Sequence, residues 1–203
     1  MAGTVASCLR KSESPDSGSL GKDEKLEISK ITDYLYLSGC QGLTPARIQN
    51  LGITCAINCI KGIKQKFPPD IEYHYIPVED DENQDLRPYF EQVLATIHKE
   101  KERGGKTLVY CGLGISRSAT FCIVYFMERE GMTLLEAYKT VQRQRSIVCP
   151  NVGFFRQMME RELTLRGKNT VAVIEPTPGV LVPDVVWNEI YEEVMQKMAT
   201  SAV

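Results

Sequence analysis

The sequence is poor in the residues that bind metals. Only two of its 203 residues are histidine, His74 and His98. Seven cysteines are present, but Cys55 and Cys59 are four positions apart and no second pair completes a zinc pattern. We therefore expect no metal site and no cofactor. The ordinary role for Cys55, Cys59 and Cys122 is packing in the hydrophobic core.

A strong charge of one sign is also missing. The net charge is −2, which gives the whole protein no attraction for a polyanion. We expect no binding of nucleic acid. Any affinity for phosphate must come from a local site.

Long hydrophobic runs are absent as well. No segment approaches the roughly 18 apolar residues of a membrane span, and Met1 to Arg10 lacks the apolar core of a signal peptide. Residue 2 is Ala, so the start does not match a myristoylation signal. The sequence predicts no membrane span and a cytoplasmic, or also nuclear, location.

Three regions differ in composition. Residues 1–26 contain a stretch rich in Ser, Gly, Lys and Asp without hydrophobic periodicity, which predicts a flexible tail. Residues 27–167 carry the periodic hydrophobic segments of a globular domain. Residues 168–203 form a C-terminal extension in which three prolines precede an amphipathic segment.

Strand and helix patterns alternate along the central region. Strands are expected at Ile28–Leu37, Ile53–Ile60, Tyr73–Val78 and Thr107–Tyr110. Helices are expected between Thr44 and Gly52, over Pro88–Arg103 and Arg117–Glu130, from a capping box at Thr133–Glu136, and from Pro150 to Gly167. This alternation predicts an α/β fold with a mainly parallel central sheet flanked by helices.

The extension has an apolar helical face. Its members are Trp187, Ile190, Tyr191, Val194, Met195 and Met198. Packing of this helix on its own domain is the favoured interpretation. Binding of a partner, or formation of a homodimer, is the alternative.

A phosphate-binding pattern stands between the last predicted strand and a long apolar helix. Cys111 is followed six residues later by Arg117 and then by Ser118, with Gly112 and Gly114 between them. A tight loop at a helix N-terminus can turn its amide groups inward and bind an anion. The guanidinium of Arg117 can bind two phosphate oxygens at once. The same donors stabilise a thiolate, which is the nucleophilic form of cysteine.

This Cys-x5-Arg-Ser pattern resembles the signature of the protein tyrosine phosphatase superfamily. The stretch from Lys30 to Gly167 resembles the small atypical dual-specificity protein phosphatases. Supporting motifs are Tyr34-Leu-Tyr-Leu, Ser116-Arg-Ser-Ala-Thr120, Leu135-Glu-Ala-Tyr138, Pro150-Asn-Val-Gly-Phe154 and Gly167-Lys-Asn-Thr170. The resemblance implies a phosphatase-like fold. It also implies hydrolysis of phosphotyrosine and phosphoserine or phosphothreonine in a phosphoprotein substrate, through a phospho-cysteine intermediate.

The resemblance also assigns roles to the loop. Cys111 would attack phosphorus, and Ser118 would help the sulfur leave in the second step. Arg117 and the loop amides would hold the transferring phosphoryl group. The loop residues in this substrate-binding role are Gly112, Leu113, Gly114, Ile115, Ser116 and Arg117.

A general acid should lie about thirty residues upstream of the cysteine, in the acidic loop. Counting back from Tyr89-Phe90 selects Asp80, and Glu79 and Asp81 are the alternatives. Asn151 matches a residue of the family that supports the phosphate loop. A plain helix N-cap is an equally good and compatible role for it.

One residue departs from the family pattern. The residue before the nucleophile is usually histidine, and here it is Tyr110. An active but slow enzyme is the expected consequence, with a weakly active phosphate-binding scaffold as the alternative. A lipid or RNA phosphatase is less favoured, because Gly112 to Ser116 contains no Lys or Arg. A redox or sulfur-transfer enzyme would not need Arg117 and Asp80 together.

Overall fold

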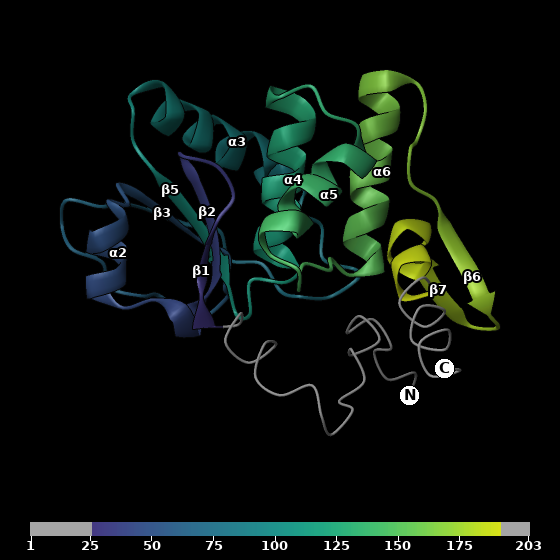
Figure 1. Ribbon diagram of the computed structural model, residues 1–203, viewed down its shortest axis with the longest axis horizontal. Coiled ribbons are helices and arrows are strands. Elements are labelled where there is room, and N and C mark those ends of the chain that lie inside the picture. The colour runs from purple at the N-terminus through teal and green to yellow at the C-terminus, as the bar shows by residue number, and fades with distance from the viewer. Residues whose placement is uncertain (1–25, 192–203) are drawn as a thin grey trace, which may run out of the picture.

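The computed structural model describes residues 26–191 and places them around one central five-stranded sheet (Figure 1). The strands are β1 (Ile28–Lys30), β2 (Leu35–Gly39), β3 (Cys55–Asn58), β4 (Glu72–Tyr75) and β5 (Thr107–Cys111). Their order across the sheet is β1-β2-β5-β3-β4. Every neighbouring pair is parallel except β1 with β2. The predicted fold class, an α/β fold with a mainly parallel sheet, is confirmed.

The helices lie on both sides of the sheet. They are α2 (Pro45–Leu51), α3 (Arg87–Glu102), α4 (Arg117–Arg129), α5 (Leu134–Gln144) and α6 (Val152–Arg166), with a short 3₁₀ helix η1 (Cys40–Gly42) after β2. Figure 1 shows α2 on one side and α3 to α6 on the other. Helix α4 packs on β5 and is surrounded by α3, α5 and α6. Its nearly all-apolar sequence follows from this central position.

The helix boundaries agree with the capping signals. Thr44 caps α2 at its first turn, and Gly52 ends it in the left-handed conformation at φ 67°. Thr133 and Glu136 form the expected capping box of α5. Asn151 caps α6 through its side chain, which accepts a hydrogen bond from the Phe154 amide.

The predicted single strand over residues 28–37 was wrong. The structure has two antiparallel strands there, joined by a turn at Thr32. The Thr32 hydroxyl accepts hydrogen bonds from the amides of Tyr34 and Leu35, which reverses the chain. A threonine hydroxyl that bonds the backbone two residues later is a turn signal. Thr32 and Asp33 carry this signal in the sequence, between Ile31 and Tyr34.

The other strands are shorter than the patterns predicted. Strand β3 ends at Asn58 and β4 at Tyr75. Residues 59–60 and 76–78 leave the ladder although they stay buried apart from Pro77, and they lead into loops at the carboxyl edge of the sheet. Burial therefore extended the apolar pattern beyond the hydrogen-bonded strand.

The C-terminal extension is part of the same packed body. Strands β6 (Val173–Thr177) and β7 (Val180–Pro183) form an antiparallel hairpin beside α6 (Figure 1). Val171, Val185 and Val186 belong to the hydrophobic core. The sequence predicted an extended segment here but no hairpin. The predicted domain boundary after residue 167 stays a prediction. The hydrophobic core continues past this residue.

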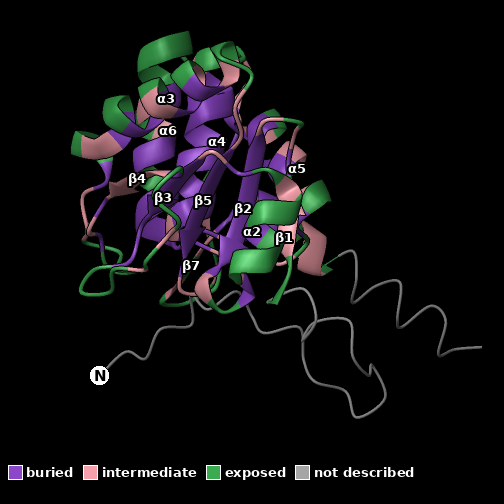
Figure 2. Cartoon of the chain, turned by 90° about the vertical axis from the view of Figure 1, so that its left-hand side faces the viewer, coloured by how far each residue is buried: buried purple, intermediate pink, exposed green. Residues whose placement is uncertain are grey.

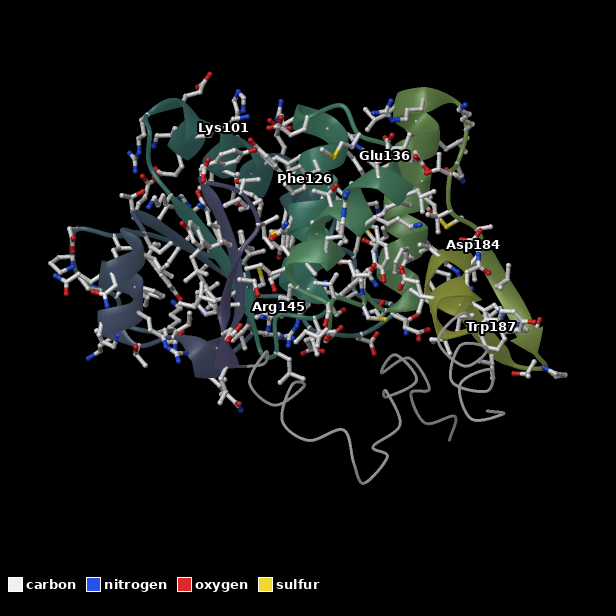
Figure 3. All side chains as sticks on the ribbon, in the orientation of Figure 1. Lys101, Phe126, Glu136, Arg145, Asp184 and Trp187 are labelled. Carbon is white, nitrogen blue, oxygen red and sulfur yellow. The ribbon has the colours of Figure 1, made fainter. Side chains whose placement is uncertain are left out.

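The predicted C-terminal helix is only partly described. Residues 184–191 are helical, with Trp187 and Ile190 partly buried and Tyr191 exposed. Figure 3 shows Trp187 on this segment. Ile190 packs against the core, as the favoured interpretation expected. Val194, Met195 and Met198 lie outside the described residues, as does the predicted tail apart from residue 26.

The sheet is the buried centre of the molecule, and the outer helix faces are exposed (Figure 2). Cys55, Cys59 and Cys122 are free thiols in this core, as expected. No helix among residues 26–191 is long and apolar enough to cross a membrane. The same residues contain no cluster of three potential metal-ligating side chains.

Candidate active site

Cys111 lies at the carboxyl end of the central strand β5, where the loop to α4 begins. It pairs with Gly39 of β2, and its side chain is buried. The sulfur accepts hydrogen bonds from the Gly114 amide at 3.2 Å and from the Ser118 hydroxyl at 3.1 Å. The loop also precedes the N-terminus of α4, where the helix dipole favours negative charge. Backbone, hydroxyl and dipole are thus all arranged to stabilise a thiolate.

Two glycines of the loop serve different purposes. Gly114 has φ 67°, and a Cβ there would lie 2.4 Å from the Ser38 backbone. Gly112 has no positive φ, but a Cβ there would lie 3.1 Å from Nη2 of Arg117. Left-handed backbone therefore requires glycine only at Gly114. At Gly112 the requirement is room for the guanidinium.

Arg117 presents an unused edge to this loop. Its Nη1 donates to the carbonyl of Val78 at 3.2 Å and to that of Cys59 at 3.5 Å. Its Nε–H is buried and has no acceptor among the described residues. A buried donor without an acceptor is costly unless a ligand supplies one. The Nε and Nη2 edge matches the bidentate geometry that guanidinium uses for phosphate.

Only one of the three candidate acids contacts the loop. Asp80 Oδ1 accepts from the Ser116 hydroxyl at 2.6 Å and from Nδ2 of Asn151 at 3.0 Å. Asp80 Oδ2 lies 3.9 Å from Nε of Arg117. Glu79 pairs instead with Lys61, and Asp81 accepts from the Asn83 amide. The geometry brings Asp80 to the site and leaves the two alternatives outside it.

Asn151 makes both of the contacts that the sequence left open. Its Oδ1 caps α6, its amide donates to the Ser116 hydroxyl at 3.3 Å, and its Nδ2 donates to Asp80. Ser116 is consequently the point where the phosphate loop, the acidic loop and α6 meet. The side chain supports the acidic loop directly and the phosphate loop through Ser116.

The first turns of α6 hold the acidic loop, which the sequence did not reveal. A Cβ on Gly153 would come within 1.9 Å of the Glu82 carbonyl oxygen, so this helix and the loop touch through their backbones. Gln157 accepts from the Leu86 amide and donates to the Gln84 carbonyl, each at 2.8 Å. The motif Pro150–Phe154 contained the glycine, but nothing in it named its neighbour.

A buried arginine behind the loop was also missed. Arg145 is fully buried, and its Nε and Nη2 donate to the carbonyls of Gly114 at 2.8 Å and Leu113 at 2.9 Å (Figure 3). Its Nη1 donates to the Glu27 carbonyl and the Ser29 hydroxyl. Holding two loop carbonyls outward helps keep the loop amides inward. A sequence gives no sign of this, because arginine is mostly exposed in proteins.

Tyr110 points away from the phosphate loop into an aromatic cluster. Its ring lies 5.9 Å from that of Phe67, which in turn packs on Tyr73. The hydroxyl is buried and makes no hydrogen bond of standard geometry among the described residues. Burial and the neighbouring Tyr73 hydroxyl raise the pKa of Tyr110 far above its usual range. The phenol therefore stays neutral, and none of these contacts reaches the phosphate loop.

Two further thiols lie near Cys111. Burial raises the pKa of Cys59 well above its ordinary value, and burial also raises the pKa of Cys122. Both thiols are therefore protonated and unreactive at neutral pH. Cys111 alone among these three combines the loop donors with a position facing the Arg117 edge.

Comparison with known proteins identifies this arrangement. The family model of the dual specificity phosphatase catalytic domain matches residues 35–164. The chain belongs to this family. Human dual specificity protein phosphatase 14 is 40% identical over 159 residues, which cover 78% of this chain and 80% of that protein. An uncharacterized protein of Caenorhabditis elegans is 43% identical over 176 residues, and this chain covers 59% of its length.

Solved structures agree with the family. A mouse putative dual specificity phosphatase superimposes with a TM-score of 0.64 at 30% identity, over 69% of this chain and 89% of that one. Human DUSP28 gives a TM-score of 0.64 at 29% identity, over 68% and 95%. These relatives support a protein phosphatase acting on phosphoproteins, and do not favour the phosphate-binding scaffold that the sequence left as an alternative.

Proposed function

We propose that this phosphatase uses Cys111 as its nucleophile and Asp80 as its general acid. The thiolate attacks phosphorus, a sulfur–phosphorus bond forms, and the bond from phosphorus to the leaving oxygen breaks. Asp80 gives its proton to that oxygen, so that a neutral alcohol or phenol leaves. The oxygen for this transfer is Oδ2, which accepts no hydrogen bond among the described residues, whereas Oδ1 accepts from both Ser116 and Asn151.

The second step hydrolyses the phospho-cysteine. Water attacks phosphorus, its proton passes to Asp80, and the bond to sulfur breaks to release phosphate. The thiolate that leaves is stabilised by the Ser118 hydroxyl and the Gly114 amide, which both donate to the sulfur. Arg117 and the inward amides bind the equatorial oxygens in both transition states.

One observation carries the proposal. The buried Arg117 Nε–H has no acceptor among the described residues, and its guanidinium edge borders the loop that encloses the Cys111 sulfur. A tetrahedral oxyanion supplies the missing acceptor. The mouse relative described above was solved as a complex with zinc tungstate, and tungstate is an oxyanion of this kind. That complex supports an oxyanion site in this chain as well.

Substrate breadth belongs to the proposal too. The family relation supports action on phosphotyrosine and on phosphoserine or phosphothreonine. The cytoplasmic or nuclear location stays a prediction, as does a homodimer through the C-terminal helix. Part of the predicted apolar face lies beyond residue 191, outside the described residues.

The test is Cys111→Ser, compared with Cys55→Ala. The control removes a buried thiol at the amino end of β3, whereas Cys111 lies at the carboxyl end of β5. A serine hydroxyl is not ionised at neutral pH and cannot replace the thiolate. We expect Cys111→Ser to lose turnover of an aryl phosphate and to retain the native circular dichroism spectrum. Acid-quenched wild-type and Cys55→Ala protein should carry phosphate on cysteine, detected by mass spectrometry. A tenth or more of wild-type activity in clean Cys111→Ser protein would refute the covalent mechanism.

A further inference from the structure

Two loops of opposite charge border the phosphate loop. The loop between β3 and β4 contains Lys61, Lys64 and Lys66, and no acidic residue before Asp70. The acidic loop contains Glu79, Asp80, Asp81 and Glu82 in succession. A protein with a net charge of −2 thus carries a basic loop and an acidic loop at one edge of its sheet, joined by the Lys61–Glu79 pair.

The basic loop is fixed beside the site. It begins just after Cys59, whose carbonyl accepts from Nη1 of Arg117. Asn58 Nδ2 donates to the Ile63 carbonyl at 2.6 Å, and the Gly62 amide donates to the Tyr75 hydroxyl at 2.9 Å. These contacts hold the loop at the carboxyl edge of β3 and β4, the edge at which Cys111 ends β5.

The three lysines are not equivalent. Lys61 pairs with Glu79 at 2.8 Å, so its charge is balanced within the protein. The ammonium of Lys64 lies 4.9 Å from the centre of the Tyr75 ring, and no carboxylate within the described residues pairs with it. Lys66 is exposed and likewise forms no ion pair with the described part of the chain. Two positive charges on the basic loop therefore remain available to a substrate.

The basic loop and the phosphate loop each carry one exposed apolar side chain. Ile63 is 54% exposed on the basic loop, and Leu113 is 45% exposed on the phosphate loop. Exposed aliphatic side chains of this size beside a phosphate site suit contact with a peptide next to the phosphorylated residue. They do not suit a fully hydrated polyanion.

The sheet geometry sets how far along a peptide the lysines act. The basic loop joins β3 and β4, which lie one and two strands from β5, or about 5 and 10 Å across the sheet. An extended peptide advances about 3.3 Å per residue. Lys64 and Lys66 should therefore meet residues about two to four positions from the phosphorylated one.

We propose that this phosphatase selects protein substrates with acidic residues on one side of the phosphorylated residue. Lys64 and Lys66, which have no carboxylate partner among the described residues, attract the acidic residues on that side. This proposal rests on the proposed function and names the substrate class of the same site. Exposed ion pairs contribute little each, so the expected preference is about three- to tenfold in kcat/KM.

The experiment uses four phosphotyrosine peptides, with acidic residues before the phosphotyrosine, after it, on both sides, or on neither. Wild-type protein is compared with the double variant Lys64→Gln/Lys66→Gln. The control is Lys139→Gln/Lys168→Gln, which removes the same charge at exposed positions on α5 and after α6. An aryl phosphate with no charge other than its phosphate measures the chemical step in every variant, which separates loss of the site from loss of selection.

The expected result is a preference for one of the two singly acidic peptides, which weakens as salt screens the charges. It should disappear in Lys64→Gln/Lys66→Gln, persist in the control, and leave aryl phosphate turnover within about twofold. Equal rates on all four peptides with normal aryl turnover would overturn the proposal. So would lysine-dependent turnover confined to vesicles that contain a phosphoinositide. Loss of aryl turnover in wild-type protein would instead refute the proposed function.

Discussion

At the scale of single residues, the contacts of one carboxylate separate it from its acidic neighbours. Asp80 accepts from Ser116 and Asn151, whereas Glu79 and Asp81 bond outside the site. Sequence counting proposed Asp80 but kept all three, because consecutive acidic residues look alike in a loop. The side-chain partners give a physical basis for the choice and for a variant that isolates proton transfer.

Asp80→Asn should remove the acid and keep the loop in place, because the asparagine oxygen can still accept from Ser116 and Asn151. We expect turnover of alkyl phosphates to fall by about 10²–10⁴-fold, the usual contribution of a general acid. The loss should be much smaller for leaving groups that are stable without a proton. Asp81→Asn is the control and should stay near wild type. Equal losses on both substrate types would argue against acid catalysis by Asp80.

Tyr110 provides a second prediction at this scale. Its hydroxyl is buried without a standard hydrogen bond, so Tyr110→Phe should leave activity unchanged and the free energy of unfolding unchanged or raised by about 1 kcal/mol. Tyr110→His brings a smaller ring with hydrogen-bonding nitrogens to the strand end. We expect it to raise kcat by up to about fivefold, which corresponds to about 1 kcal/mol in the barrier.

The pH profile of kcat/KM distinguishes two causes of such an increase. If the Tyr110→His substitution improves the placement of the loop amides, the plateau should rise while the acidic limb stays in position. If the substitution changes only the ionisation of the thiol, the limb should move and the plateau should barely change. An unchanged plateau and limb would show that Tyr110 is a neutral departure from the family.

At the scale of elements, α6 holds the acidic loop in position. Its cap residue Asn151 bonds Asp80, its glycine touches the Glu82 backbone, and Gln157 bonds Leu86 and Gln84. A helix about 70 residues later in the sequence thus sets the position of the proposed acid. The acidic loop has no regular secondary structure of its own to do so.

Gly153→Ala should therefore reproduce the Asp80→Asn phenotype from a distance. Alanine normally favours a helix over glycine by about 1 kcal/mol, so instability of α6 itself is not expected. The added methyl group would displace the Glu82 backbone, and turnover of alkyl phosphates should fall by about 10²-fold or more, with less effect on good leaving groups. Thr164→Ala, exposed on the same helix, is the control. A uniform loss on all substrates would contradict this role.

At the scale of the whole molecule, a buried carboxylate joins the C-terminal extension to the domain. Glu162 is fully buried and accepts from the amides of Leu134 and Thr170, each at 2.7 Å, and from the Thr170 hydroxyl at 2.8 Å. It therefore connects α6, the start of α5 and the extension. Asn151 is 11 residues away along α6, about 16 Å from this junction.

Glu162→Gln should lower the free energy of unfolding by about 1–3 kcal/mol, because an amide leaves one buried N–H without an acceptor. Glu160→Gln is the control. It breaks an exposed pair with Arg87 and should cost about 1 kcal/mol or less. Urea titration measures both, and aryl phosphate turnover should stay normal where the proteins are folded. An equal effect of the two variants would mean that the junction is not a special anchor.

The sequence by itself determined the fold class, the caps of α2, α5 and α6, and the loop from Cys111 to Ser118. These features depend on residues close together in the chain, so their periodicity and spacing remain visible in one dimension. Local patterns failed at Thr32, where a threonine hydroxyl forms a turn. They also failed after Asn58 and Tyr75, where buried residues continue past the last hydrogen-bonded residue of the strand.

Only the tertiary structure decided which groups meet. The contacts of Asp80 with Asn151, of Gly153 with Glu82 and of Arg145 with the phosphate loop join residues 31 to 71 positions apart. Each depends on where the chain returns to the same edge of the sheet, which helix packing fixes. An arginine or a glycine has no mark in the sequence for the neighbour that it will meet. The loop could thus be predicted from its own residues, but its supports could not.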